Sequence, residues 1–135
     1  MSDESNKGLI NYRIQRAQEH LKSAEILSNA GQYSDSIGRS YYAMIAAAKS
    51  LLALKDIDSK KHDGEISLFN KLFVKTGLID RAAAKDLTKA RVRRESSDYA
   101  DFYIVSREDA LMQLEMARSF IRTVEIKIEQ LMKEK

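Results

Sequence analysis

The stretch Ser34–Leu54, which reads SDSIGRSYYAMIAAAKSLLAL, decides the fold of this chain. Between Ser36 and Leu54 only Arg39 and Lys49 are charged. Apolar side chains recur at helical spacing along one side, namely Ile37, Tyr41, Met44, Ala48, Leu51 and Leu52. A helix that is apolar or small on nearly every side is normally buried at the centre of its domain. We therefore expect the other helices to pack around this one.

The opposite side of the same helix carries small side chains, which let a second helix approach closely: Ser40, Ala43, Ala46, Ala47, Ser50 and Ala53. Arg39 and the Tyr41–Tyr42 pair stand out against this background, because they bring polar groups to a helix with little exposed surface. Arg39 and Tyr42 are the first candidates for a functional contribution from this helix.

Length and composition indicate one all-α domain. The 135 residues correspond to a single domain, residues 1–135, in which we expect residues 1–7 to be disordered. The absence of cysteine excludes disulfides, thiolate zinc sites and cysteine nucleophiles. The absence of proline and the abundance of Ala, Leu, Lys and Glu are typical of helices.

The same composition bears on location and partners. No apolar run reaches the roughly 20 residues of a membrane span. The N-terminal MSDESNKG lacks the apolar core of a signal peptide. We therefore expect a cytoplasmic protein with no membrane contact. The net charge of +3 permits an acidic partner without requiring one.

Hydrophobic periodicity predicts an up-and-down bundle of four long helices and one short helix. A polar cluster at Ser96–Asp98 indicates a turn between the fourth and fifth helices. The predicted helices span about 8–29, 34–55, 64–75, 78–94 and 106–132, with a polar loop at 56–63.

Three helix ends carry recognisable signals. Gly31 has the position of a left-handed C-cap residue. Ser34 or Asp35 then has the position of an N-cap. Ser106 and Asp109 have the spacing of a capping box, with aspartate in place of the usual glutamate.

The chain contains no recognisable metal or nucleophile motif. The two histidines, His20 and His62, are far apart in the sequence and have no ligand neighbours at metal-site spacing. No Ser-His-Asp set and no glycine-rich phosphate loop can be assembled. We therefore expect no metal and no cofactor. We interpret His20 as a packing or surface residue and His62 as a capping or loop residue.

The predicted fourth helix ends in a cluster of basic residues: Lys85, Lys89, Arg91, Arg93 and Arg94. Arg91 and Arg94 are three positions apart and share a helix face. Cations at a helix C-terminus stabilise the helix dipole, which is the simpler explanation. The functional alternative is phosphate binding, with Tyr99, Phe102 and Tyr103 available to stack on bases.

A second hypothesis joins Arg94 to the central helix. Asp98 follows Arg94 by four positions, so the two would pair across one turn if the helix continued. Arg39 would be a neighbour, and a buried arginine needs a carboxylate such as Asp98 or Asp101 to compensate its lost hydration. The hypothesis is a cluster of Arg39, Arg94, Asp98 and Tyr99. The simpler alternative is a polar network that fixes helix register.

Three segments together resemble the HEPN domain, specifically a small prokaryotic branch of it. They are RSYYAMIAAAKSLL at 39–52, KKHDGEISLFNKLFVKTGLID at 60–80 and RRESSDYADFY at 93–103. The resemblance covers nearly the whole chain in order. It implies a helical bundle that commonly dimerises. It also implies a gene often encoded beside a minimal nucleotidyltransferase, the two acting as toxin and antitoxin.

Many HEPN domains are metal-independent ribonucleases that use an arginine followed, after four to six residues, by a histidine. Arg94 matches the arginine, but Tyr99 stands where the histidine belongs. Tyrosine, with a pKa of about 10, is a poor general base at neutral pH compared with imidazole. Arg94 and Tyr99 are therefore the catalytic candidates, but the usual nuclease mechanism lacks its imidazole.

The resemblance thus favours a module that binds a minimal nucleotidyltransferase and a nucleotide or RNA. A ribonuclease toxin with an altered active site and a purely structural, dimerising bundle are the alternatives. The candidate nucleotide- or RNA-binding residues are Arg39, Tyr42, Arg91, Arg94, Asp98, Tyr99 and Tyr103.

The regular apolar stripe of the last predicted helix and the small-residue face of the central helix predict a homodimer, because both surfaces suit close helix packing. Light scattering at micromolar concentration should give twice the 15.4 kDa mass of the chain. A monomer at that concentration would contradict this prediction.

Overall fold

The computed structural model describes residues 3–55, 62–99 and 101–134, with the side chains of all of these except residues 3–5, 62, 63 and 99. All regular structure within these ranges is helical, which confirms the predicted all-α bundle of four long helices and one short helix. The elements are α1 (Asp3–Asn29), α2 (Tyr33–Leu54), α3 (His62–Phe69), the π-helical segment η1 (Asn70–Val74), α4 (Arg81–Tyr99) and α5 (Arg107–Lys133). None of the helices in the described ranges is both long and apolar enough to cross a membrane.

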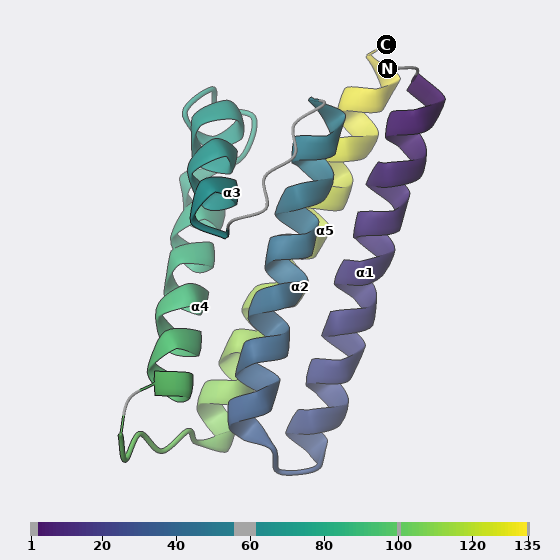
Figure 1. Ribbon diagram of the computed structural model, residues 1–135. Helices are drawn as coiled ribbons and strands as arrows, with labels where there is room; N and C mark the ends of the chain where they lie inside the picture. Colours follow the sequence, from purple (N-terminus) through teal and green to yellow (C-terminus); the bar gives the residue numbers. More distant parts are fainter. Residues whose placement is uncertain (1–2, 56–61, 100, 135) are drawn as a thin grey trace.

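Helix α2 lies at the centre of the bundle, as predicted (Figure 1). It packs most extensively against α1 and also contacts α5, α4 and α3. It runs antiparallel to α1 and α4 and in the same direction as α5. Ser36 Oγ donates a hydrogen bond of 2.7 Å to the carbonyl of Ala24 in α1. Most of the small side chains of α2 are buried: Ser40, Ala43, Ala47, Ser50 and Ala53.

The connection between α1 and α2 is one residue shorter than the sequence predicted. Gly31 has a φ of +80°, and the amide of Gln32 donates to the carbonyl of Leu27 at 2.8 Å, which is the geometry of a Schellman motif. This confirms the predicted role of Gly31. Because the motif turns the chain so tightly, α2 begins at Tyr33. The prediction that Ser34 or Asp35 caps α2 is therefore wrong.

The predicted helix 64–75 is interrupted. Helix α3 begins at His62 and ends at Phe69, and the next five residues form the π-helical η1, closed by a 2.9 Å bond from the Lys75 amide to the Asn70 carbonyl. The wider turn lets Phe69 and Phe73 both point into the core, with ring centroids 5.9 Å apart. Of the predicted loop 56–63, residues 56–61 lie outside the described part of the chain.

Helix α4 begins later and ends later than predicted. It starts at Arg81 rather than Leu78, where the Asp80 side chain accepts a 3.0 Å bond from the Ala82 amide. It continues to Tyr99, so the predicted turn at Ser96–Asp98 is wrong. The Ser97 hydroxyl bonds the Arg94 carbonyl at 3.1 Å, which satisfies this polar side chain inside the helix.

Two helix ends elsewhere can be compared with the sequence. The capping box at the start of α5 is confirmed: the Asp109 amide donates to Ser106 Oγ at 3.0 Å, and the Ser106 amide to Asp109 Oδ2 at 3.4 Å. Helix α1 begins at Asp3, five residues before the predicted start, and Asn6 in its first turns is already buried. Packing of those turns supports the longer helix.

Gln113 of α5 is fully buried and connects three helices. Its Nε2 donates to the carbonyl of Ile37 in α2 at 3.2 Å and to that of Ala90 in α4 at 3.0 Å. Its Oε1 accepts a bond of 3.4 Å from Arg93 Nη1. Because a buried amide is costly unless it is hydrogen-bonded, these contacts fix the register of α4 against α2 and α5.

We expect Gln113→Ala to lower the free energy of unfolding by about 1–3 kcal/mol, since it removes these bonds and opens a cavity. Urea denaturation followed by circular dichroism measures the change. Gln130→Ala, at an exposed position of the same helix, is the matched control and should cost less than about 0.5 kcal/mol. Equal effects of the two substitutions would contradict the assigned role of Gln113.

Candidate functional site

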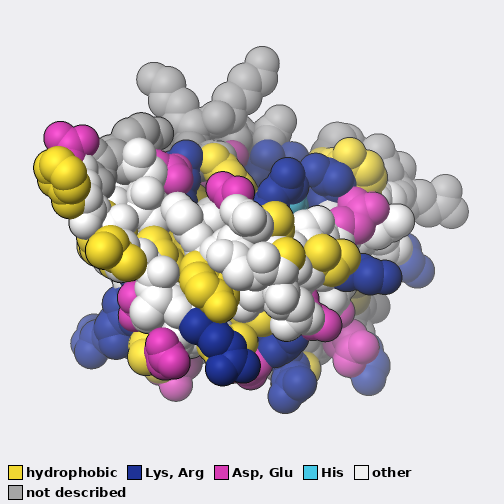
Figure 2. Space-filling view, turned by 90° about the horizontal axis from the view of Figure 1, so that it is seen from below, with side chains coloured by type: hydrophobic (Ala, Val, Ile, Leu, Met, Phe, Trp, Pro, Cys, Tyr) yellow, Lys and Arg dark blue, Asp and Glu magenta, His cyan; other side chains and the backbone are white. Residues whose placement is uncertain are grey.

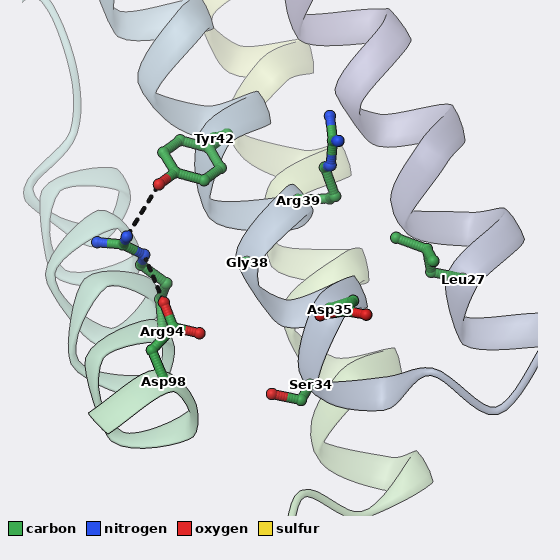
Figure 3. A pocket seen from close by; sticks show the side chains of 8 residues that line it. All are labelled: Leu27, Ser34, Asp35, Gly38, Arg39, Tyr42, Arg94 and Asp98. Atoms are coloured by element: carbon green, nitrogen blue, oxygen red, sulfur yellow. Dashed lines mark hydrogen bonds and ion pairs between the residues drawn. The ribbon is translucent and has the colours of Figure 1, made fainter. Parts of the chain in front are cut away.

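A pocket of about 320 Å³ opens between the first half of α2 and the last turns of α4 (Figure 3). We call it the Arg94 pocket. Its lining comprises Leu27, Ser34, Asp35, Gly38, Arg39, Tyr42, Arg94 and Asp98. Four of the residues proposed from the sequence therefore line one pocket: Arg39, Tyr42, Arg94 and Asp98.

Arg94 is held from three sides. Its Nη2 donates a 2.9 Å hydrogen bond to the Tyr42 hydroxyl, and its Nε lies 3.2 Å from Asp98 Oδ2 in an ion pair (Figure 3). The Cζ atom lies 5.2 Å from the centroid of the Tyr42 ring and 5.8 Å from that of Tyr41. These contacts orient the guanidinium, while 21% of the side chain remains exposed to a ligand.

The ion pair exists because α4 continues past Arg94. Arg94 and Asp98 are one helical turn apart, so a continuous helix places both side chains on the same face. The Ser34 hydroxyl contacts the Ser97 carbonyl at 3.4 Å and ties this last turn of α4 to the start of α2. The local helix therefore builds one wall of the pocket.

Arg39 differs from the sequence hypothesis in its surroundings. It is exposed rather than buried, so it needs no carboxylate to compensate lost hydration. Figure 3 shows its side chain on the α1 side of the pocket, pointing away from Arg94. Its Nη1 lies 3.3 Å from Nδ1 of His20 in α1. The hypothetical cluster is thus divided, with Arg94 and Asp98 on one side and Arg39 on the other.

Two further candidates, Arg91 and Tyr103, lie outside the described lining of the Arg94 pocket. Arg91 pairs with Glu95 on the surface of α4, with 3.0 Å between Nε and Oε1. Tyr103 lies in the connection between α4 and α5 and is 41% exposed. Tyr99 is the last residue of α4, and its side chain is outside the described part of the structure. Asp101 is exposed in the same connection.

The connection from α4 to α5 exposes apolar side chains at the lower end of the bundle. Phe102 is fully exposed and has a left-handed φ of +60°, which is uncommon for a residue with a side chain. Ile104 is 87% exposed. Figure 2 shows hydrophobic side chains at this end separated by charged ones.

His20, which we interpreted as a packing or surface residue, lies beside two of the candidate residues, Tyr42 and Arg39. Its ring centroid lies 6.1 Å from that of Tyr42, and Arg16 Nη2 lies 3.5 Å from its Nε2. Burial, followed by the charges of Arg16 and Arg39, lowers its pKa from the ordinary value of 6.5, against a smaller opposing effect of Glu19. His20 is therefore a neutral imidazole at pH 7.

A signal for His20 was available in the sequence. Leu9, Arg13, Arg16 and His20 follow one another at steps of four, three and four, the spacing of one face of a helix. The structure places this face against α2, where the four residues line one cavity with residues of that helix.

The chemistry of the pocket is that of hydrogen bonding and charge. Arg39 and Arg94 are balanced by Asp35 and Asp98, so the lining offers both donors and acceptors with no net charge. Such a set suits the polar edges of a nucleotide better than an isolated phosphate. Among the described residues, no three His, Cys, Asp or Glu side chains gather as metal ligands would.

A family model described as HEPN domain matches residues 10–127 of the chain. The "UPF0332 protein PH1297" of Pyrococcus horikoshii is 49% identical over 78 residues, which are 58% of this chain and 55% of that protein. Two relatives come from Methanocaldococcus jannaschii. "Putative toxin MJ0605" is 38% identical over 86 residues, 64% of each chain. "Putative toxin MJ0142" is 32% identical over 108 residues, 80% of this chain and 74% of that protein.

The matches to the Pyrococcus protein and to the first Methanocaldococcus protein span less than two thirds of the length of those relatives. The name of the Pyrococcus protein gives only a family, UPF0332, whereas the name of the Methanocaldococcus protein describes a toxin.

The lowered pKa of His20 predicts a pH-dependent stability. At a pH between the lowered pKa and 6.5, His20 is protonated in the unfolded chain but not in the folded one. The contribution of neutral His20 to the free energy of unfolding is therefore complete above pH 6.5 and is lost as the pH falls through the lowered pKa. Thermal unfolding should therefore show less loss of stability on acidification for His20→Gln than for the unchanged chain. His62→Gln measures how much the other histidine contributes to the loss of stability on acidification. An unchanged slope in His20→Gln would contradict the prediction.

Proposed function

Because the chain belongs to the HEPN family, we propose that it is the HEPN component of a two-component, toxin–antitoxin-like system whose other component is a minimal nucleotidyltransferase. The family model covers most of the chain, and two relatives carry toxin names. Both findings support this proposal. We further propose that the Arg94 pocket binds a nucleotide, either free or within RNA.

The observation that carries the binding proposal is the fixed guanidinium of Arg94. The Tyr42 hydroxyl, the Asp98 carboxylate and two tyrosine rings hold it in one orientation. A guanidinium that is already oriented loses little conformational entropy when a ligand binds. Arg39 adds a second cation on the opposite rim of the pocket, and Asp35 adds an acceptor.

A ribonuclease activity is the second candidate function, and the position of His20 favours it. The imidazole that is absent from position 99 is present on α1, where its ring lies 6.1 Å from Tyr42. A neutral imidazole can accept a proton from a ribose hydroxyl, and an arginine can stabilise the charge that develops on the phosphate. His20 would supply the imidazole and Arg94 the guanidinium, and both lie beside Tyr42.

We expect Arg94→Ala to weaken binding of a short single-stranded RNA by about tenfold or more, because it removes a charge-assisted contact. Fluorescence anisotropy of labelled RNA measures the affinity. Lys89→Ala, which removes an exposed cation from the same helix, is the matched control. If Arg94→Ala and Tyr42→Phe lower only the thermal midpoint and leave RNA affinity unchanged, the pocket is a structural network and the binding proposal fails.

The same samples, incubated with RNA in the presence of a chelator, test the second candidate. Cleavage that disappears in both Arg94→Ala and His20→Ala would establish the ribonuclease function. Intact RNA in every sample would reject it.

Co-expression with a minimal nucleotidyltransferase encoded beside this chain should give a complex on size-exclusion chromatography, and separate elution would contradict the partner proposal.

A further inference from the structure

Gly38 lies in the interior of α2, where the backbone gives no reason for a glycine. Gly31 and Gly77 adopt a left-handed φ of +80°, whereas Gly38 has no positive φ and continues the helix. Glycine inside a helix is less stable than alanine, because its backbone loses more conformational freedom on folding. The helix itself therefore does not call for glycine at this position.

Helix packing does not call for it either. A Cβ atom placed on Gly38 would meet no described heavy atom within 4 Å, apart from those of its own stretch of helix. Neither α1 nor α4 therefore comes close enough to exclude a methyl group. The empty space beside Gly38 belongs instead to the Arg94 pocket, whose lining includes this residue.

Gly38 is at the middle of the face of α2 that lines the Arg94 pocket. Ser34, Gly38 and Tyr42 follow one another at steps of four, and Asp35 and Arg39 are their neighbours on the same face. Figure 3 shows Gly38 between Asp35 and Arg39 along α2. The pocket therefore has bare helix backbone at its centre, which we call its floor, and longer side chains around that floor.

The side chains around the floor offer polar contacts on more than one side. Arg94 and Asp98 lie across the pocket on α4 (Figure 3). On α2, the Asp35 carboxylate is exposed and forms no hydrogen bond or ion pair with any described residue, so both of its oxygens can accept. The apolar side chain of Leu27 closes the α1 side.

This arrangement matches a flat group with apolar faces and polar edges. Bare backbone lets such a group approach the helix closely, as glycine does in many ligand sites. The pocket lining carries no net charge, which gives little attraction for a phosphate but supplies donors and acceptors for an uncharged polar group. Of the parts of a nucleotide, the base has this chemistry.

We propose that the Arg94 pocket receives the base of the nucleotide, with one face against the floor at Gly38, and that Gly38 determines whether a base fits. The edges of the base bond Asp35 on one side and the Arg94–Asp98 pair on the other. The sugar and phosphate stay outside the pocket. The inference deepens the proposed function and rests on it for the class of ligand.

The test fills the floor of the pocket in the full chain. We expect Gly38→Ala to raise the thermal midpoint by about 2–4 °C, because alanine suits a helix better. The same variant should bind a short single-stranded RNA about tenfold more weakly, because the methyl group holds the base away from the backbone. Gly38→Leu should weaken binding further. Thermal unfolding and fluorescence anisotropy measure the two effects.

Gly8→Ala is the matched control. Gly8 is an exposed glycine of α1, and a Cβ atom placed on it would also meet nothing within 4 Å. The substitution should leave the RNA affinity within about twofold. Wild-type affinity in both Gly38→Ala and Gly38→Leu would overturn the inference, as would a lower thermal midpoint that accompanies the loss of binding in Gly38→Ala.

Competition identifies the part of the ligand that enters the pocket. Adenosine, guanosine and ribose 5-phosphate are each added at millimolar concentration to the complex with labelled RNA. Displacement by either nucleoside that is weaker in Gly38→Ala supports a base on the floor. Equal displacement in the two proteins, displacement by ribose 5-phosphate alone, or no displacement by any of the three would overturn the inference.

The variants also separate this inference from the proposed function. RNA that fails to bind the unchanged chain would contradict both. Weaker binding in Arg94→Ala together with wild-type binding in the two Gly38 variants would support the Arg94 pocket and overturn the role of its floor. Weaker binding in Arg94→Ala and in Gly38→Ala, with wild-type affinity in Gly8→Ala, is the result that we expect.

Discussion

The buried amide of Gln113 is the constraint on which the arrangement of the helices around the site depends. It bonds carbonyl groups of Ile37 in α2 and Ala90 in α4. Ala90 is one helical turn before Arg94, and Ile37 is little more than one turn before Tyr42. Satisfying this amide therefore places the guanidinium of Arg94 at the hydroxyl of Tyr42. A shift of α4 along α2 would leave buried polar groups without partners.

Tyr42 separates two cavities that have different chemistry. On the α4 side, Arg94 is paired and stacked, and the charges of the Arg94 pocket cancel. On the α1 side, the lining of a second cavity includes Arg16 and Lys49, which pair with Glu19 and Glu65. The protein itself fixes the orientation of the Arg94 guanidinium, whereas the Arg16–Glu19 pair is exposed and contributes little to stability.

Most of the fold could be predicted from the sequence, because periodicity and glycine position are local signals. They identified the central helix, the cap at Gly31 and the capping box at Ser106. Local sequence preferences predicted the wrong structure where packing or a tight turn decided the outcome. Examples are the π-helical η1, which contains Phe73, and Ser97, which lies within α4. The pairing of Arg94 with Asp98 was predicted only on the condition that the helix continued, which the turn predicted at Ser96–Asp98 opposed. The contact between His20 and Arg39 could not be predicted, because it depends on how α1 rests against α2.

The three-residue connection around Gly31 has a consequence for how the chain folds. A short connection costs little entropy to close, so the extensive packing of α2 against α1 forms between segments that are close in sequence. The described lining of the cavity at Arg16 and Lys49 comes from this helical hairpin. The Arg94 pocket requires α4 as well, and its contacts span more than 50 residues, as between Tyr42 and Arg94. We therefore expect the cavity between α1 and α2 to form before the Arg94 pocket during folding.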